Sequence, residues 1–80
     1  MQTAKGGYDF LLFNKYACEV KRYAKGKNYL TAWWDQAEKQ ADDVGMKPVL
    51  FYRFDRKPWR VVTRSREFDS IEQFLAVGDA

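Results

Sequence analysis

The chain has 80 residues, 14 Lys and Arg against 11 Asp and Glu, no His and one Cys, so it is long enough for one small domain spanning residues 1–80. The absence of His excludes imidazole acid–base catalysis, Ser-His triads and His-containing zinc sites, and the lone Cys18 excludes an internal disulfide. Any catalysis must use carboxylates, Lys, Tyr or a metal with oxygen ligands.

The first part of the chain predicts a β-hairpin. Residues 8–13 are apolar and aromatic, and residues 16–23 form a second strand-like run after a tight turn at Asn14-Lys15. Because side chains alternate along a strand, Cys18 is expected on the buried face and Glu19 on the opposite one. A loop with Gly26 follows.

A helix is predicted next. Apolar residues between positions 30 and 44 recur at intervals of three and four, which is typical of an amphipathic helix. Thr31 is the expected N-cap and Gly45 the expected C′ residue. Trp33 and Trp34 of this helix, like Trp59 further along the chain, favour packing in a core or a dimer interface over stacking on unpaired bases.

The second half predicts another hairpin and a short helix. The strands are expected at 48–54 and 59–63, and the helix at 69–75, where Asp69 and Glu72 resemble a capping box. The order β-β-α-β-β-α indicates an α/β or α+β domain with a mixed sheet.

Three residues of the first hairpin carry the main chemical signal. Glu19 and Lys21 lie two apart on one strand, and a suitable register would bring Asp9 of the other strand beside them. Two carboxylates suit Mg²⁺ or Mn²⁺, and the ammonium group could position an attacking water or stabilise developing charge. The alternative is a cross-strand salt bridge on a solvated sheet face.

The order of these pieces resembles the PD-(D/E)xK nuclease superfamily, with its closest likeness to archaeal Holliday junction resolvases and small phage-type nucleases. The matching segments are GYDFLL with Asp9, CEVKRY with Glu19 and Lys21, and WWDQAEKQA with Gln36, followed by GMKPVLFYRF. The resemblance spans residues 6 to 63. It implies a restriction-endonuclease-like sheet.

The resemblance also implies roles. Asp9 and Glu19 would hold Mg²⁺ or Mn²⁺, Lys21 would assist the attacking water, and Gln36 would support the site. Family members usually have an acidic helix and a strand before the Asp-bearing strand, and here eight residues precede Asp9. The chain is therefore expected to be either a truncated or minimal version without this N-terminal helix, or one whose missing cover comes from a second subunit, and we expect a homodimer.

Basic residues gather in two segments, 21–27 and 53–66, and such patches attract polyanions. An ordinary solvated surface of a small basic protein is the alternative. The residues expected to contact nucleic acid are Arg22, Tyr23, Lys25, Lys27, Arg53, Arg56 and Lys57. Phosphate contacts position a substrate without reading its sequence, which favours structure-selective cleavage of branched DNA, such as junctions or flaps.

The sequence thus predicts a metal-dependent DNA endonuclease. A non-catalytic module on the same fold, binding nucleic acid or protein, is the alternative, and an RNA nuclease is a third possibility. The chain contains neither the apolar run of a signal peptide nor a membrane-spanning stretch. We expect a soluble cytoplasmic protein of a phage or its prokaryotic host, with no membrane partner.

Overall fold

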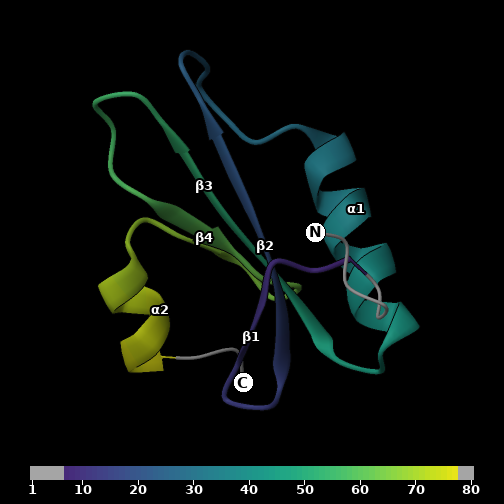
Figure 1. The fold of residues 1–80 in the computed structure, drawn as a ribbon. Helices are drawn as coiled ribbons and strands as arrows, with labels where there is room; N and C mark the ends of the chain where they lie inside the picture. The colour runs from purple at the N-terminus through teal and green to yellow at the C-terminus, as the bar shows by residue number, and fades with distance from the viewer. Residues whose placement is uncertain (1–6, 78–80) are drawn as a thin grey trace.

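The computed structural model describes residues 7–77, which form a five-stranded mixed sheet with two helices (Figure 1). The elements in chain order are β1 (Phe10–Leu12), β2 (Tyr16–Tyr23), α1 (Thr31–Asp43), β3 (Lys47–Phe54), β4 (Arg60–Val62), β5 (Glu67–Phe68) and α2 (Ile71–Val77). The predicted α+β class with a mixed sheet is confirmed, and the architecture is compatible with a restriction-endonuclease-like fold. The order differs from the prediction by one added short strand, β5.

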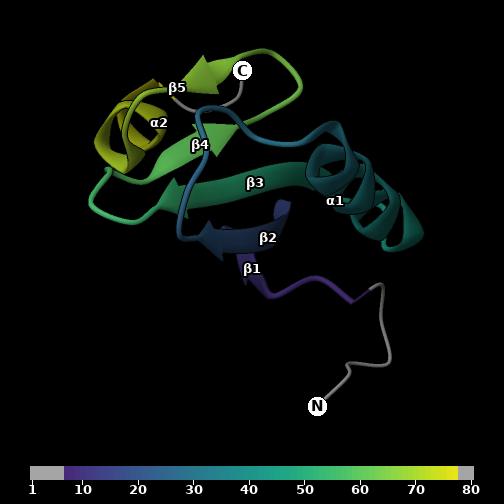
Figure 2. The same ribbon diagram turned by 90° about the horizontal axis from the view of Figure 1, so that it is seen from above.

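The strands lie in the sheet in the same order as in the chain, β1 to β5, as Figure 2 shows. Only β2 and β3 are parallel, and every other neighbouring pair is antiparallel. Parallel neighbours need a long crossover, which α1 provides. The two eight-residue strands β2 and β3 therefore form a rigid centre, with a register that pairs Glu19 with Leu50 and Lys21 with Tyr52.

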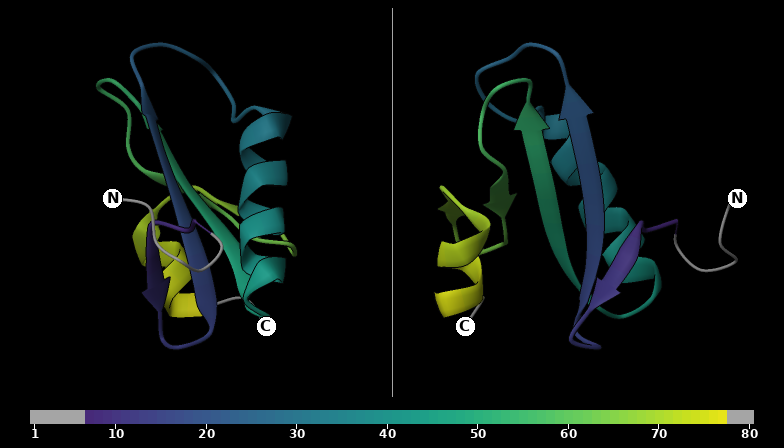
Figure 3. Two further views of the ribbon diagram at one scale, coloured as in Figure 1. Left: turned by 45° about the vertical axis from the view of Figure 1, so that its right-hand side comes forward. Right: turned by 60° about the vertical axis from the view of Figure 1, so that its left-hand side comes forward.

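The helices cover opposite faces of the sheet, so the molecule has three layers (Figure 3). Alternation along β2 and β3 divides their side chains between two cores. The core under α2 contains Tyr16, Cys18, Val49, Phe51, Val61, Phe68 and Phe74, and the core under α1 contains Trp33, Ala37, Leu50, Tyr52, Phe54 and Val62. No helix within residues 7–77 combines the length and apolar character needed to cross a membrane.

The N-cap of helix α1 lies one residue earlier than predicted. Thr31 is already helical, and Leu30 is the N-cap, with an extended backbone and no side-chain hydrogen bond. The prediction of Thr31 as the cap is wrong because burial of Trp33 and Ala37 against the sheet fixes where the helix begins. At the other end Gly45 has φ 69°, and its N–H donates to the Asp42 carbonyl, as predicted for a C′ glycine.

The turn of the first hairpin also differs from the prediction. It is centred on Phe13 and Asn14, both with positive φ, and the Lys15 N–H donates to the Leu12 carbonyl at 3.1 Å. Asn tolerates this left-handed conformation, but an aromatic residue adopts it rarely. The turn therefore lies one residue earlier than Asn14-Lys15, and it holds Phe13 with 69% of its surface exposed.

The C-terminal helix begins two residues later than predicted. Its N-cap is Ser70, whose hydroxyl accepts a hydrogen bond from the Gln73 N–H at 3.1 Å. Asp69 cannot take that role because its carboxylate pairs with Arg60 at 3.1 Å. The capping box predicted from Asp69 and Glu72 is thus wrong, and the Gln73 side chain instead accepts from the Asp69 N–H.

Candidate active site and nucleic-acid interface

Glu19 and Lys21 of β2 project from the face of the sheet that α1 covers. Glu19 is buried, with 5% of its surface exposed, and Lys21 Nζ lies 3.3 Å from Glu19 Oε2. The neighbouring Cys18 faces the other core, as predicted. The alternative interpretation predicted a cross-strand salt bridge on a solvated face, whereas this ion pair lies within β2, its Glu19 is buried, and it uses only one of the two Glu19 carboxylate oxygens.

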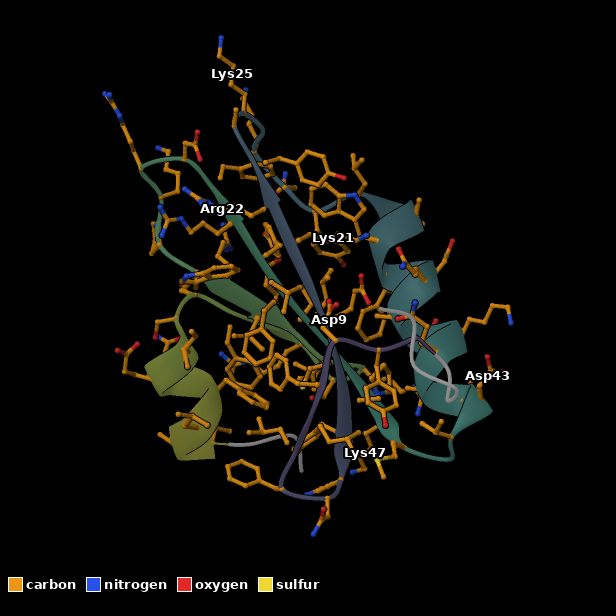
Figure 4. The ribbon with its side chains drawn as sticks, viewed as in Figure 1. Asp9, Lys21, Arg22, Lys25, Asp43 and Lys47 are labelled. Atoms are coloured by element: carbon orange, nitrogen blue, oxygen red, sulfur yellow. The ribbon has the colours of Figure 1, made fainter. Side chains whose placement is uncertain are left out.

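Asp9 is the residue immediately before β1. The strand register pairs Phe10 with Cys18, and the Asp9 N–H donates to the Cys18 carbonyl at 2.8 Å. Its carboxylate Oδ2 accepts a hydrogen bond from the Val20 N–H at 2.7 Å. Figure 4 shows Asp9 beside β2 and Lys21 on the α1 side of that strand. The hairpin therefore brings Asp9 to the segment that carries Glu19 and Lys21.

The electrostatics of Glu19 reflect this arrangement. Burial raises the pKa of Glu19, and the nearby negative charge of Asp9 raises it further, while the Lys21 ammonium acts in the opposite direction. Two carboxylates so placed repel one another, and a bound cation would relieve that repulsion. The same burial and charge raise the pKa of the Cys18 thiol to about 12, which excludes it as a nucleophile at neutral pH.

The oxygens available here fit a hard divalent cation. Glu19 Oε1 is buried and has no hydrogen-bond partner within residues 7–77, and Asp9 is exposed beside it. No group of three or more metal-ligating side chains occurs in the described part of the chain. Two carboxylates are sufficient for Mg²⁺ or Mn²⁺, since such ions retain several waters and bind substrate phosphates.

The helix glutamine closest to the sheet is Gln40 rather than Gln36. The two lie one turn apart on one side of α1, while Glu38 and Asp42 on the other side pair with Arg64 beyond β4. The glutamine side thus faces β2. Gln36 is exposed, whereas Gln40 is half-buried and its Oε1 has no donor among the described residues. Counting two turns from the buried Trp33 would have identified Gln40.

The predicted nucleic-acid residues lie around the ends of β2 and β3. Arg22 is exposed and 3.7 Å from Asp55, and Tyr23 stacks on Trp33 with ring centroids 4.8 Å apart. Lys25 extends from the tip of the β2–α1 loop, as Figure 4 shows, and Arg56 is exposed in the β3–β4 turn. These residues present positive charge at one end of the molecule.

The other three predicted contacts, Lys27, Arg53 and Lys57, border a cavity described below. The Arg53 guanidinium lies 5.9 Å from the Trp59 ring, and its Nε is buried without a hydrogen-bond partner in the described chain. Trp33 is buried, and Trp59 packs against the core under α2. These two tryptophans therefore contribute to packing, as predicted.

Comparisons with known proteins bear on this site. A family model described as "Phage putative PDDEXK endonuclease" matches residues 11–77. Protein D14 of Escherichia phage T5 is 28% identical over 64 residues, an alignment that covers 68% of this chain and 40% of D14. The chain thus spans less than half the length of that relative. No solved structure matches the chain.

Proposed function

The chain belongs to this phage PDDEXK endonuclease family, and on that premise we propose that it hydrolyses phosphodiester bonds of DNA with a divalent metal, Mg²⁺ or Mn²⁺. The observation that carries the proposal is the juxtaposition of Asp9 with the Glu19–Lys21 pair, including one buried Glu19 oxygen that has no hydrogen-bond partner among the described residues. We further propose that residues 1–80 act as a single nuclease domain.

Each residue of the site has a role that follows from its chemistry. Asp9 and Glu19 would hold the cation, and Glu19 Oε1 has no hydrogen-bond partner among residues 7–77. Lys21 Nζ donates to the attacking water or to a phosphate oxygen as charge develops. The bound cation supplies Lewis-acid stabilisation of the phosphate. The water oxygen bonds to phosphorus, one P–O ester bond breaks, and the leaving oxygen takes a proton. Gln40 is a positioning residue. Gln36, which the resemblance implies as a supporting residue, is not included in this proposal.

The preferred substrate is branched DNA, such as a junction or a flap. Positive residues at the ends of β2 and β3 support this part of the proposal because they offer phosphate contacts, which orient a substrate without reading its sequence. Arg22, Lys25 and Arg56 are exposed at that end, and Tyr23 has 48% of its surface exposed.

The active form is a homodimer. Exposed apolar residues at edge strand β1 and its turn, Phe10, Leu11 and Phe13, support this, because an apolar edge strand offers a surface for a second copy. Two cuts on a junction also need two sites. Sedimentation equilibrium of the protein measures the mass directly, and a monomer at micromolar concentration contradicts this part.

The catalytic proposal is tested by cleavage and by metal binding together. Duplex, flap, four-way and RNA substrates are incubated with Mg²⁺ or Mn²⁺ and the wild-type, Glu19→Gln, Lys21→Ala or Asp43→Asn protein. Asp43 is an exposed carboxylate of α1, so its variant is the matched control. We expect cleavage of branched DNA, lost in the first two variants and kept in the third. Cutting of RNA alone would reassign the substrate.

Calorimetry separates the nuclease from a non-catalytic module that binds nucleic acid or protein. Titration of Mn²⁺ into the wild type should give a binding isotherm, and Asp9→Asn should remove it. A non-catalytic module predicts salt-dependent DNA binding that is indifferent to metal and to this substitution. Absence of Mn²⁺ binding in the wild type would overturn the assignment of Asp9 and Glu19.

A further inference from the structure

A cavity of about 390 Å³ lies between the β2–α1 loop, the end of β3, the β3–β4 turn and the segment before α2. Its lining residues are Gly26, Lys27, Tyr52, Arg53, Phe54, Lys57, Pro58, Arg60 and Asp69. Four of these nine side chains are basic and one is acidic. Three of the four were predicted to contact nucleic acid, so the cavity gathers residues that come from separate segments of the chain.

The cations of the cavity differ in how far they are neutralised. Arg60 pairs with Glu67 at 2.7 Å and with Asp69 at 3.1 Å, and the Tyr52 hydroxyl donates to Glu67 at 2.5 Å. These contacts hold Tyr52 and Arg60, the floor of the cavity, in place. They also neutralise the charge of Arg60. Lys27 and Lys57, in contrast, form no ion pair within residues 7–77 and are exposed. Two ammonium groups are therefore left to bind an anion.

The floor of the cavity is in register with the candidate catalytic lysine. The parallel pairing places Lys21 opposite Tyr52, and the next pairing places Tyr52 opposite Arg60. Residues opposite one another on neighbouring strands project from the same face. Lys21 and the cavity floor thus form one row across the sheet, separated by one to two inter-strand spacings, roughly 5–10 Å. Tyr52, which lies between them, is fully buried, with Tyr29 and Trp33 packed against it.

The cavity also depends on a glycine. A Cβ built on Gly26 would lie 2.3 Å from Phe54 Cε1, so the loop can approach the Phe54 ring this closely only without a side chain. The close approach sets the position of the following residue, Lys27, at the rim. The wall of the cavity is therefore part of the packed structure.

We propose that this cavity binds a phosphate group of a DNA strand, with Lys27 and Lys57 as its ligands. The proposal rests on the proposed nuclease function and adds a second contact to it. A phosphate fits because Lys27 and Lys57, which form no ion pair among the described residues, line the cavity together with Arg53, so its four basic residues outnumber the two carboxylates that Arg60 binds. The group is either an internal phosphodiester or the terminal phosphate of a strand.

The test is a titration followed by NMR in EDTA, where no cleavage takes place. A four-residue thymidine oligonucleotide, with or without a 5′-phosphate, is added to the protein while the amide signals of Gly26, Lys27 and Lys57 are recorded. Shifts with both oligonucleotides assign an internal phosphate, and shifts only with the phosphorylated one assign a terminal phosphate. Either result supports the proposal, and the absence of shifts at these three residues overturns it.

A variant with both Lys27→Gln and Lys57→Gln provides the second measurement. Fluorescence anisotropy with a 20-residue single strand should show affinity lowered by about tenfold, and a slope of log K against log salt reduced by roughly 0.7 to 1.4. Lys39→Gln, an exposed lysine of α1 outside the cavity, should change neither. Equal losses in the two variants would contradict a specific site.

The two proposals fail in different ways. Unchanged DNA binding by the double variant, with cleavage still lost in Glu19→Gln, overturns the cavity assignment and leaves the nuclease. Cavity binding with no cleavage of any substrate by the wild type overturns the nuclease and leaves the cavity assignment.

Discussion

The carboxylate of Asp9 accepts a 2.7 Å hydrogen bond from the backbone N–H of Val20, the residue between Glu19 and Lys21. Strand β1 has only three residues and lies at the edge of the sheet. A side-chain bond to the neighbouring strand extends the hairpin beyond the last paired residue. This bond uses one of the two carboxylate oxygens of Asp9. A structural contact and the proposed metal site thus share one side chain.

This relationship predicts different stabilities for two substitutions of Asp9. The amide oxygen of Asp9→Asn can still accept from the Val20 N–H, and its neutral side chain no longer repels Glu19, so its free energy of unfolding should equal or exceed that of the wild type. Asp9→Ala loses the acceptor and should be less stable by about 1 kcal/mol. Urea unfolding followed by Trp fluorescence measures both. Equal loss in both variants would contradict a role for the hydrogen bond.

Glu19 should destabilise the metal-free protein. Its pKa is raised in the folded state by burial and by Asp9, so the folded protein binds this proton more tightly than the unfolded chain does. The resulting penalty is absent below the unfolded pKa of roughly 4.3 and is complete once the pH exceeds the folded pKa. Glu19→Gln should therefore melt at a higher temperature than the wild type at pH 7, and the difference should disappear near pH 4.

Calorimetric melting with and without Mn²⁺ provides the control for that prediction. Mn²⁺ at 100 times its Kd should stabilise the wild type by about 2.7 kcal/mol and leave Glu19→Gln unchanged. A wild type that exceeds Glu19→Gln in stability at pH 7 without metal contradicts the assigned electrostatics.

The sequence predicts the centre of the fold better than its ends. Strands β2 and β3 are long, and alternation along β2 alone places Cys18 and Glu19 on opposite faces. The two residues of β5 carry no such pattern. They form a strand because β4 offers them an open edge, and because Phe68 fills the core under α2 while Glu67 pairs with Arg60.

The candidate site shows the same division. Asp9, Glu19 and Lys21 are local to one hairpin, so their approach could be predicted from a register, although the side-chain bond to Val20 could not. The choice between Gln36 and Gln40 depends on how α1 is rotated against the sheet. That rotation is set by Trp33, Ala37 and the other buried residues of the helix, which are tertiary contacts.

Gln40 is predicted to matter for activity more than for stability. Its Oε1 is buried without a donor among residues 7–77, a cost that a substrate or an attacking water would relieve. Gln40→Ala should therefore retain or gain stability. It should lower the single-turnover cleavage rate by about tenfold or more, because a side chain that orients the substrate or the water contributes to the rate. Gln36→Ala is the control and should cleave at the wild-type rate. Equal rates in both variants would remove Gln40 from the site.

Phe13 offers a stabilising substitution. It has φ 57° and 69% of its surface exposed, so its backbone is strained and its ring buries little area. At a protein concentration low enough for the chain to be monomeric, Phe13→Gly should raise the free energy of unfolding by about 0.5–1 kcal/mol. Asn14→Gly, at φ 54°, should gain less because Asn tolerates the left-handed region. A loss of stability in Phe13→Gly that depends on protein concentration would indicate that the ring is buried between subunits.

Gly26 should tolerate no side chain, for a reason different from that at Gly45. A methyl group at Gly26 would meet the Phe54 ring, which is buried between Trp33 and Tyr52 and has little room to move. Gly26→Ala should lower the free energy of unfolding by about 1–3 kcal/mol, as overpacking does. Gly45→Ala meets no atom within 4 Å and should lose only about 1 kcal/mol, from its left-handed backbone. The Gly26 substitution also bears on DNA binding.

Because the Gly26 loop forms a wall of the basic cavity, Gly26→Ala should also weaken DNA binding, whereas Gly45→Ala should not. Urea unfolding measures the stabilities and fluorescence anisotropy the affinities. If Gly26→Ala is destabilised but binds DNA as tightly as the wild type, the loop does not contribute to DNA binding by the cavity.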